Sequence, residues 1–388
     1  MRETKKSWFI LFVVSLFLFT FAACAPKVRK PVSELDTPQH HTFSGLKLLD
    51  EGKTKEALRE FNLALELEPK YSMAHAGVAL VAALNADFKG AMESIKKADK
   101  YAKSNEEKLF VHVSRIRIYT LGKLDKNWLE KARDEFDDAI KIDPQASAAY
   151  YYMGMAYKTA LDFSQAGQMF RKVIDINKEY VRQADKEWNL TQKIERAMPG
   201  TITGKKIALL EKITRADAAA LFMEELRIDN LYRKRTIKTF DTSFKTPEKA
   251  KSQAGVSTKI PQDIAEHPLK TDILGILEIG VRGLESYPDG LFHPYDFVDR
   301  ATYAMMIEDI LIKVTGDNTL ATKFIGQTSP FPDLRSDLPF FNAVMVVTSR
   351  GFMEVQDFTS GEFAPHKPVA GVDALLAIRK FKEELKFF

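Results

Sequence analysis

Between residues 41 and 180 the sequence repeats at a spacing of 34 residues, and this spacing limits the possible folds more than any other feature. Each repeat has an alanine, a large apolar residue four positions later and a small or β-branched residue three positions after that. The matching triplets are Ala57-Phe61-Ala64, Ala91-Ile95-Ala98, Ala132-Phe136-Ala139 and Ala166-Phe170-Val173. Small residues let paired helices approach closely, and the large residue fills the space between them. The spacing predicts stacked two-helix units.

These triplets, with Gly45 and Gly154 upstream and Pro69 and Pro144 downstream, resemble the tetratricopeptide (TPR) pattern. The second-to-third step is 41 residues long, which predicts a longer first helix over residues 104–122. The resemblance implies four repeats and a capping helix within residues 41–198, with a concave face that binds a protein or peptide. The positions expected to face this groove are Thr42, Leu46, Ala76, Leu80, Tyr151, Met155 and Lys158. The alternative is that these side chains are ordinary packing or solvated residues.

The N-terminus has the composition of an export signal. Basic residues precede an apolar run from Trp8 to Ala23, which is short for a membrane span. We therefore expect a signal peptide over residues 1–23, the alternative being an anchor helix that stays in place. Residues 24–40 are rich in proline and polar residues and predict a flexible tether.

Cys24 is the only cysteine in the chain, so it has no internal disulfide partner. The stretch Phe21-Ala22-Ala23-Cys24 resembles a bacterial lipobox, although that motif prefers leucine where Phe21 stands. The resemblance implies lipidation of Cys24 and a membrane-anchored protein. Ala25 after the cysteine implies the outer membrane, with the protein facing the periplasm.

The C-terminal half contains a different set of spaced motifs. A turn at Tyr287-Pro288-Asp289-Gly290 is followed by Phe292-x-Pro294 and by a helix start at Asp299-Arg300. This arrangement resembles an S-layer homology (SLH) repeat. Weaker copies flank it, and the three copies cover residues of about 200–228, 260–312 and 329–388. The helix start recurs as Thr214-Arg215-Ala216-Asp217, and the third copy has Gly371 in place of the arginine.

An arginine in the first turn of a helix opposes the helix dipole at a cost of about 0.3–1 kcal/mol, so its recurrence needs a reason. Free amides at a helix start, together with a guanidinium, favour an anion. The resemblance implies that a wall glycan binds at Arg300, Asp289, Gly290 and Tyr287, and also at Arg215. The alternative is that Arg300 pairs with an acid such as Asp296 or Asp299.

The sequence as a whole predicts a mostly α fold, in which a TPR helical solenoid is followed by SLH-like helical repeats with short turns or strands. We found no catalytic motif, metal-ligand spacing or phosphate loop, and a net charge of +4 gives no argument for nucleic acid. The leading hypothesis is a non-enzymatic envelope lipoprotein without a cofactor. It would link a membrane to wall glycan or peptidoglycan and dock a protein partner. The alternatives are an assembly factor for an export, pilus or outer-membrane machine, and an enzyme with an unrecognised site.

Overall fold

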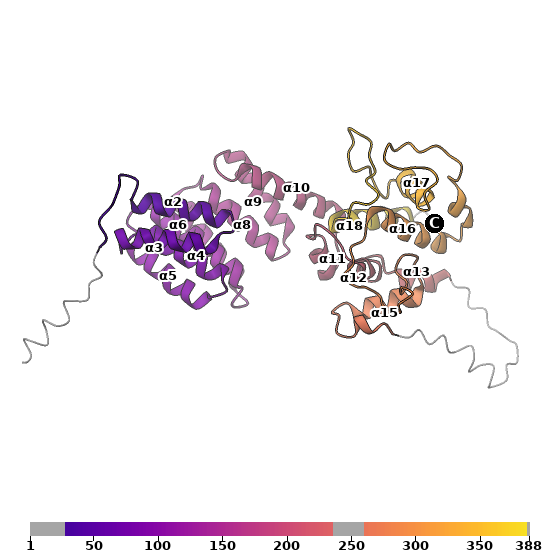
Figure 1. The fold of residues 1–388 in the computed structure, drawn as a ribbon, viewed down its shortest axis with the longest axis horizontal. Helices are drawn as coiled ribbons and strands as arrows, with labels where there is room; N and C mark the ends of the chain where they lie inside the picture. The colour runs from indigo at the N-terminus through magenta and orange to yellow at the C-terminus, as the bar shows by residue number, and fades with distance from the viewer. Residues whose placement is uncertain (1–27, 236–259, 386–388) are drawn as a thin grey trace, which may run out of the picture. The chain divides into compact units, whose positions relative to one another are not determined.

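The computed structural model describes residues 28–235 and 260–385 (Figure 1). The chain divides into two compact units, residues 1–188 and 189–388, and the boundary falls within a helix. In the described ranges the regular structure is helical, with two isolated antiparallel bridges, Thr214 with Phe297 and Asp299 with Pro368. The expected mostly helical fold class is confirmed.

The first unit is a solenoid of four antiparallel helix pairs, as the 34-residue spacing predicts (Figure 1). The helices are α2 (Pro38–Asp50), α3 (Thr54–Leu67), α4 (Ser72–Leu84), α5 (Phe88–Tyr101), α6 (Asn105–Gly122), α7 (Trp128–Ile142), α8 (Ser147–Thr159), α9 (Phe163–Ile176) and α10 (Val181–Ala197). The expected longer first helix of the third pair is confirmed as α6. The first helix of each pair contacts the first helix of the next pair, so α2, α4, α6 and α8 form one wall.

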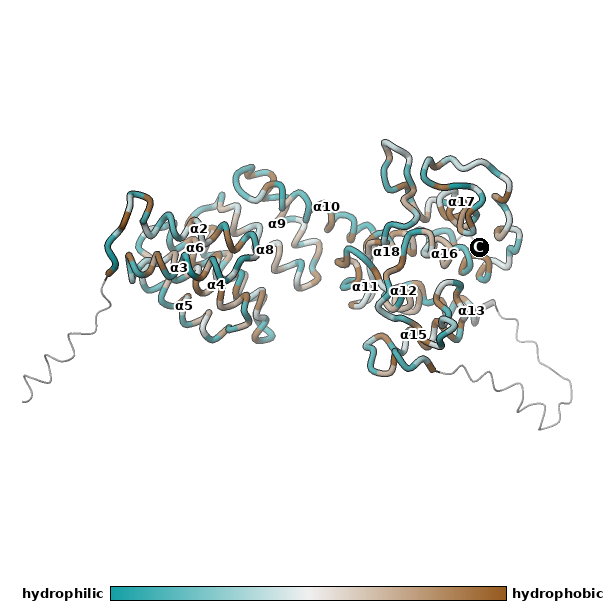
Figure 2. The backbone as a smooth tube through the Cα atoms, in the orientation of Figure 1, coloured by the Kyte–Doolittle hydropathy of each residue, from teal (hydrophilic) through white to brown (hydrophobic). Residues whose placement is uncertain are grey.

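The recurring triplets make the contacts between paired helices. The Phe61 ring is fully buried against Gly45 and Gly77, where a Cβ atom would lie only 2.6 and 2.4 Å from it. Phe170 meets Gly154 in the same way, at 2.6 Å. Figure 2 shows hydrophobic stretches along α4, one of these wall helices. Large aromatic rings against glycines bring the helix axes close together, which explains the spacing of the motif.

The segment before α2 differs from the flexible tether expected over residues 24–40. Its described part is an ordered loop: the Arg29 amide donates to the Glu66 carbonyl at 2.8 Å, and Asp36 is buried beneath the loop. α2 already begins at Pro38, with Thr37 as its N-cap. The polar composition that suggested flexibility supplies the hydrogen bonds that hold this loop.

The second unit contains three helical copies, which we call copy one (residues 200–228), copy two (260–312) and copy three (329–388). The helices of this unit are α11 (Ile202–Ile207), α12 (Arg215–Ala220), a π-helical turn (Leu221–Leu226), α13 (Ile228–Arg235), α15 (Lys270–Ile279), α16 (Arg300–Thr315), α17 (Phe341–Ser349) and α18 (Gly371–Leu385). Short 3₁₀ turns cover Gln262–Ile264 and Asn318–Thr322.

The three copies close into a ring through one residue of each. Ile213 donates its amide to the Val369 carbonyl at 2.9 Å. Val369 donates to Val298 at 3.0 Å, and Val298 donates back to Ile213 at 3.0 Å. All three side chains are buried. The copies therefore meet around a pseudo-threefold centre, an arrangement that the sequence alone left open.

Candidate functional site

Arg215, at the start of α12, reaches from copy one into the turn of copy two. Its guanidinium donates from Nε to the Phe292 carbonyl at 2.9 Å, from Nη1 to Gly283 at 2.6 Å and from Nη2 to Glu285 at 2.7 Å. It lies 4.6 Å from the Tyr287 ring centre and is buried. A planar fork with several donors fits this set of main-chain acceptors, so Arg215 holds two copies together.

Arg300 makes the same connection one copy further along the chain. Its Nε donates to the Phe363 carbonyl at 2.7 Å and its Nη2 to the Glu354 carbonyl at 2.5 Å. The guanidinium lies 4.5 Å from the Phe363 ring centre, and the residue is only 5% exposed. Burial lowers the pKa of Arg300, although an arginine remains charged. The first-turn arginine therefore connects copies.

Neither of the two proposed acids holds Arg300. Among the described residues, no ion pair joins Arg300 to a carboxylate within 4.0 Å, and Asp299 instead caps α16 by accepting from the Thr302 amide at 2.7 Å. The simple pairing of Arg300 with Asp296 or Asp299 is therefore wrong. Main-chain carbonyls take the place of the carboxylate because each turn presents them to the preceding copy.

The helix starts do not offer free amides to an anion. Arg215 and Ala216 donate their N–H groups to the carbonyls of Asp296 and Pro294, at 2.9 and 3.1 Å. The corresponding amides of α16, from Arg300 and Ala301, donate to Lys367 and Pro365 at 3.0 and 2.9 Å. The prediction of an anion at these helix mouths is wrong, because the neighbouring copy already occupies the donors.

Gly371 explains why copy three lacks the arginine. A Cβ atom at this position would lie 1.7 Å from the Ile207 carbonyl oxygen, and the Gly371 amide donates to the Leu210 carbonyl at 2.9 Å. Copy one has α11 where the other copies have a turn, and its backbone fills the space that an arginine would need. The loss of the arginine therefore follows from the shorter first copy.

The predicted grouping of Arg300 with the turn of copy two is also wrong. Tyr287 lies against Arg215 instead, and Asp289 and Gly290 belong to the same exposed turn. Gly290 has φ of +81°, which a residue with a side chain rarely adopts. The sequence placed these residues near Arg300 because they precede it in the same copy, whereas each arginine reaches the turn of the following copy.

The exposed Asp289 carboxylate is used within its own turn. It accepts from the Leu291 amide at 2.9 Å and contacts the His293 ring nitrogen at 2.7 Å. The Leu291 hydrogen bond and the His293 contact lower the pKa of Asp289, and the same contact raises the pKa of His293. This arrangement stabilises the turn.

A basic groove of about 700 Å³ lies beside Arg300, and sequence analysis missed most of its residues. Its basic residues are Lys193 and Arg196 from α10, Arg300 from α16, and Arg379 and Lys380 from α18. The acids in its lining are Glu354, Asp373 and Glu383. The only feature of the sequence that could have indicated this groove was two pairs of basic residues, Lys193 with Arg196 and Arg379 with Lys380.

Ion pairs neutralise part of this groove. Lys193 lies 3.7 Å from Asp373, Arg379 lies 2.8 Å from Glu383, and Lys380 lies 2.8 Å from Glu354. Arg196 and Arg300 have no such carboxylate partner within 4.0 Å among the described residues. Because five cations face three carboxylates, the groove has a surplus of positive charge that suits an anion.

The predicted TPR groove residues on α8 are engaged with the segment that leads into α10. The Tyr151 ring stacks on Tyr180 with centres 4.8 Å apart, and Lys158 lies 2.5 Å from the Glu187 carboxylate. Burial raises the pKa of Tyr151 to about 12. Met155 packs into the same cluster. These residues join the last pair to its cap while remaining partly exposed.

Two aromatic residues beside Tyr151, namely Tyr152 and Tyr180, were not among the predicted groove residues. Tyr152 lies edge-on to Tyr180 at 5.5 Å, and the Arg117 guanidinium lies 4.4 Å from the Tyr152 ring centre. The tyrosine run at 150–152 was the available signal. Together with Tyr151 these side chains form an aromatic and cationic cluster on the wall of first helices.

The remaining predicted groove residues are mostly core. Leu80 is fully buried, so its assignment to the groove is wrong, and Thr42 and Ala76 are likewise buried. Leu46 is partly buried and packs against the core around Phe61. Position within the repeat does not predict exposure here, because helix α4 is covered on several sides by α2, α3, α5 and α6.

Cys24 and the predicted signal peptide lie outside the described residues. Among the helices that the structure describes, none is long and apolar enough to cross a membrane. The described residues also contain no cluster of three or more His, Cys, Asp or Glu side chains suited to a metal ion.

The helix pairs and their packing form a TPR-like helical solenoid. The chain is 30% identical over 139 residues to human tetratricopeptide repeat protein 6, covering 35% of this chain and 25% of that protein. It is 27% identical over 96 residues to superkiller protein 3 of Schizosaccharomyces pombe, covering 22% of this chain and 7% of that protein. The chain thus spans a quarter or less of the length of these relatives. No family model matches.

A solved structure described as the functional characterization of Pseudomonas aeruginosa PilF also shares similarity with this chain. It is 15% identical, covers 42% of this chain and 93% of that chain, and has a TM-score of 0.22.

Proposed function

We propose that this chain is a non-enzymatic envelope lipoprotein that docks a protein on its TPR array and holds an anionic wall polymer in its second unit. The basic groove beside Arg300 supports the polymer site, because the exposed Arg196 lacks a carboxylate partner there and the lining holds more cations than acids. The resemblance of the three copies to SLH repeats supports a wall glycan as the polymer. The lipobox-like stretch at Cys24 supports the anchor and an outer-membrane location.

The polymer site can be tested without disturbing the buried arginine. Arg196 is exposed on α10, so Arg196→Gln removes groove charge without opening the core. The affinity for purified cell wall, measured by co-sedimentation, should fall by about tenfold, because the variant loses one charge-assisted hydrogen bond. The matched control is Arg335→Gln, because Arg335 is also exposed but is paired with Asp337 away from the groove.

Equal pelleting of both variants would contradict the groove assignment. If the unsubstituted protein does not pellet with wall material, the second candidate becomes the stronger one. In that case the TPR array is the working part of an assembly factor for an envelope machine.

The aromatic cluster at Tyr151 and Tyr152 supports protein docking on the wall of first helices. A photo-crosslinking residue at Met155 should capture a defined protein partner in intact cells. The same residue at Lys172, exposed on α9, is the matched control and should capture much less of it. Equal capture at both positions would contradict docking on this face.

A further inference from the structure

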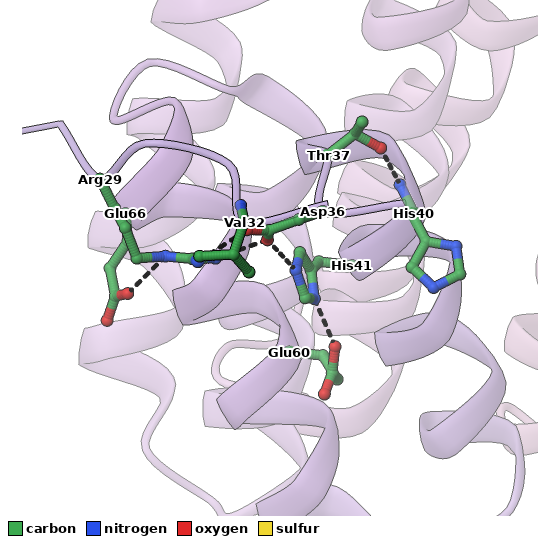
Figure 3. A network of polar contacts seen from close by, with 8 residues as sticks. All are labelled: Arg29, Val32, Asp36, Thr37, His40, His41, Glu60 and Glu66. Atoms are coloured by element: carbon green, nitrogen blue, oxygen red, sulfur yellow. Dashed lines mark hydrogen bonds and ion pairs between the residues drawn. The ribbon is translucent and has the colours of Figure 1, made fainter. Parts of the chain in front are cut away.

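The loop before α2 is fixed by a polar network (Figure 3). The Asp36 carboxylate accepts from the Arg29 guanidinium at 2.7 and 2.8 Å, and from the Val32 amide at 2.7 Å. The His41 ring contacts Asp36 at 2.9 Å on one side and Glu60 at 2.6 Å on the other. The loop is therefore closed around the buried carboxylate of Asp36.

The same segment leaves its apolar side chains in solvent. Four of the sixteen exposed large apolar residues of the described chain fall within its first sixteen described residues. Their exposed fractions are Val28 58%, Val32 85%, Leu35 68% and Phe43 68%. An ordered loop that buries Asp36 and exposes valine and leucine gains little from its own packing, which points to an apolar contact outside the protein.

Phe43 lies on the outer side of the first helix of the solenoid. α2 buries Thr42, Gly45 and Leu49 against the array. On the opposite face, at positions three and four residues apart, it exposes His40, Phe43 and Lys47. In a solenoid this end face is where another repeat would pack, and here the face is bordered by the loop.

We infer that the exposed apolar side chains of Val32, Leu35 and Phe43, at this end of the solenoid, rest on the surface of a lipid bilayer. The inference builds on the proposed lipidation of Cys24, which precedes Val28 by four residues. Four residues span at most about 14 Å, so a lipid at Cys24 keeps the face within reach of the membrane. This short reach favours a bilayer over a protein occupant.

The charges around the face fit an anionic bilayer. Lys30 and Lys47 are exposed beside it and can extend their ammonium groups toward lipid headgroups while their stems cover apolar surface. Asp36 and Glu60 are paired with Arg29 and His41, and the exposed Glu66 is also paired with Arg29, at 3.3 Å. Glu34 is the exposed acid of the loop, and Lys30 offsets it.

The test places a fluorescent probe on the face of the full lipidated protein in vesicles. Cys24 is the only cysteine and its sulfur would carry the lipid, so Leu35→Cys supplies one free thiol for an environment-sensitive dye. In phosphatidylethanolamine–phosphatidylglycerol vesicles, lipids with a nitroxide near the headgroup should quench the dye at residue 35. The same should hold for Phe43→Cys.

The matched control is Leu124→Cys, which places the dye on the loop between α6 and α7, at a residue 57% exposed. Quenching at residue 35 at least several-fold above that at residue 124 supports the inference. Equal quenching at both positions in a palmitate-labelled protein overturns the inference and leaves the anchor standing.

Two further outcomes are informative. Failure of the unsubstituted chain to incorporate palmitate removes the anchor and the inference with it. The dye at residue 35 could instead be shielded from solvent in detergent, without vesicles, and the protein could sediment as a dimer in analytical ultracentrifugation. These two results together would assign the face to a second copy of the chain and overturn the bilayer contact.

Discussion

At the scale of single residues, the two arginines show how one side chain joins distant segments. Arg215 contacts carbonyls 68 to 77 residues away in sequence, and Arg300 contacts carbonyls 54 and 63 residues away. The dipole cost of a first-turn arginine is offset by charge-assisted bonds to carbonyls that would otherwise lose their hydrogen bonds on burial.

Arg215→Lys should reduce the free energy of unfolding of the second unit by about 2–4 kcal/mol. A lysine ammonium cannot reach three separated carbonyls in one plane, so buried acceptors lose their donors. Denaturant unfolding followed by circular dichroism measures the change. Arg335→Lys, at a residue 79% exposed, is the control and should change stability little. If Arg215→Lys lowers the free energy of unfolding no more than the control does, Arg215 does not hold copies one and two together.

Gly371→Ala should destabilise the same unit by about 1–3 kcal/mol, because the added methyl group meets the Ile207 carbonyl. Gly200→Ala is the matched control, since the nearest atom to its Cβ is a side-chain oxygen 3.6 Å away. Thermal melts of both variants make the comparison. Unchanged stability of Gly371→Ala would mean that copies one and three do not pack as closely as described.

At the scale of elements, the loop before α2 depends on the charge of His41. Burial lowers the pKa of His41, but the hydrogen bonds to Glu60 and Asp36 outweigh it, and the net pKa is raised. The hydrogen bonds that Asp36 makes with Arg29 and His41 lower the pKa of Asp36. The stabilisation from His41 is therefore present below pH of about 6.5 and is lost as pH rises through its raised pKa. The stabilisation from Asp36 is lost in acid.

Trypsin cleavage after Arg29, whose guanidinium is held by Asp36 in the closed loop, should therefore become faster between pH 6.5 and pH 9, after correction for the activity of the protease. In His41→Gln this rise should be absent, because glutamine does not titrate. A parallel rise in both proteins would contradict the role of His41 in holding the loop.

At the scale of the whole molecule, the hydrogen-bonded ring of Ile213, Val298 and Val369 makes the second unit depend on all three copies. A chain that ends at residue 328 lacks copy three and leaves the Arg300 guanidinium and the Ile213 amide without their acceptors. We expect this chain to lose the cooperative melting of the second unit and to keep that of the TPR array. Differential scanning calorimetry makes the comparison, and two retained transitions would contradict closure of the three copies.

The sequence alone predicted the helices of the TPR array. Glycine and phenylalanine at fixed offsets pack against each other between helices that are neighbours along the chain, so the contacts leave a local pattern. The sequence also located the three copies and their arginines. Only the tertiary structure decided what those arginines do, that the groove lies at Arg196 and Arg300, and that the segment before α2 is ordered. Each of these depends on partners that are distant in sequence or are main-chain carbonyls, and neither kind of partner leaves a local pattern of residue types.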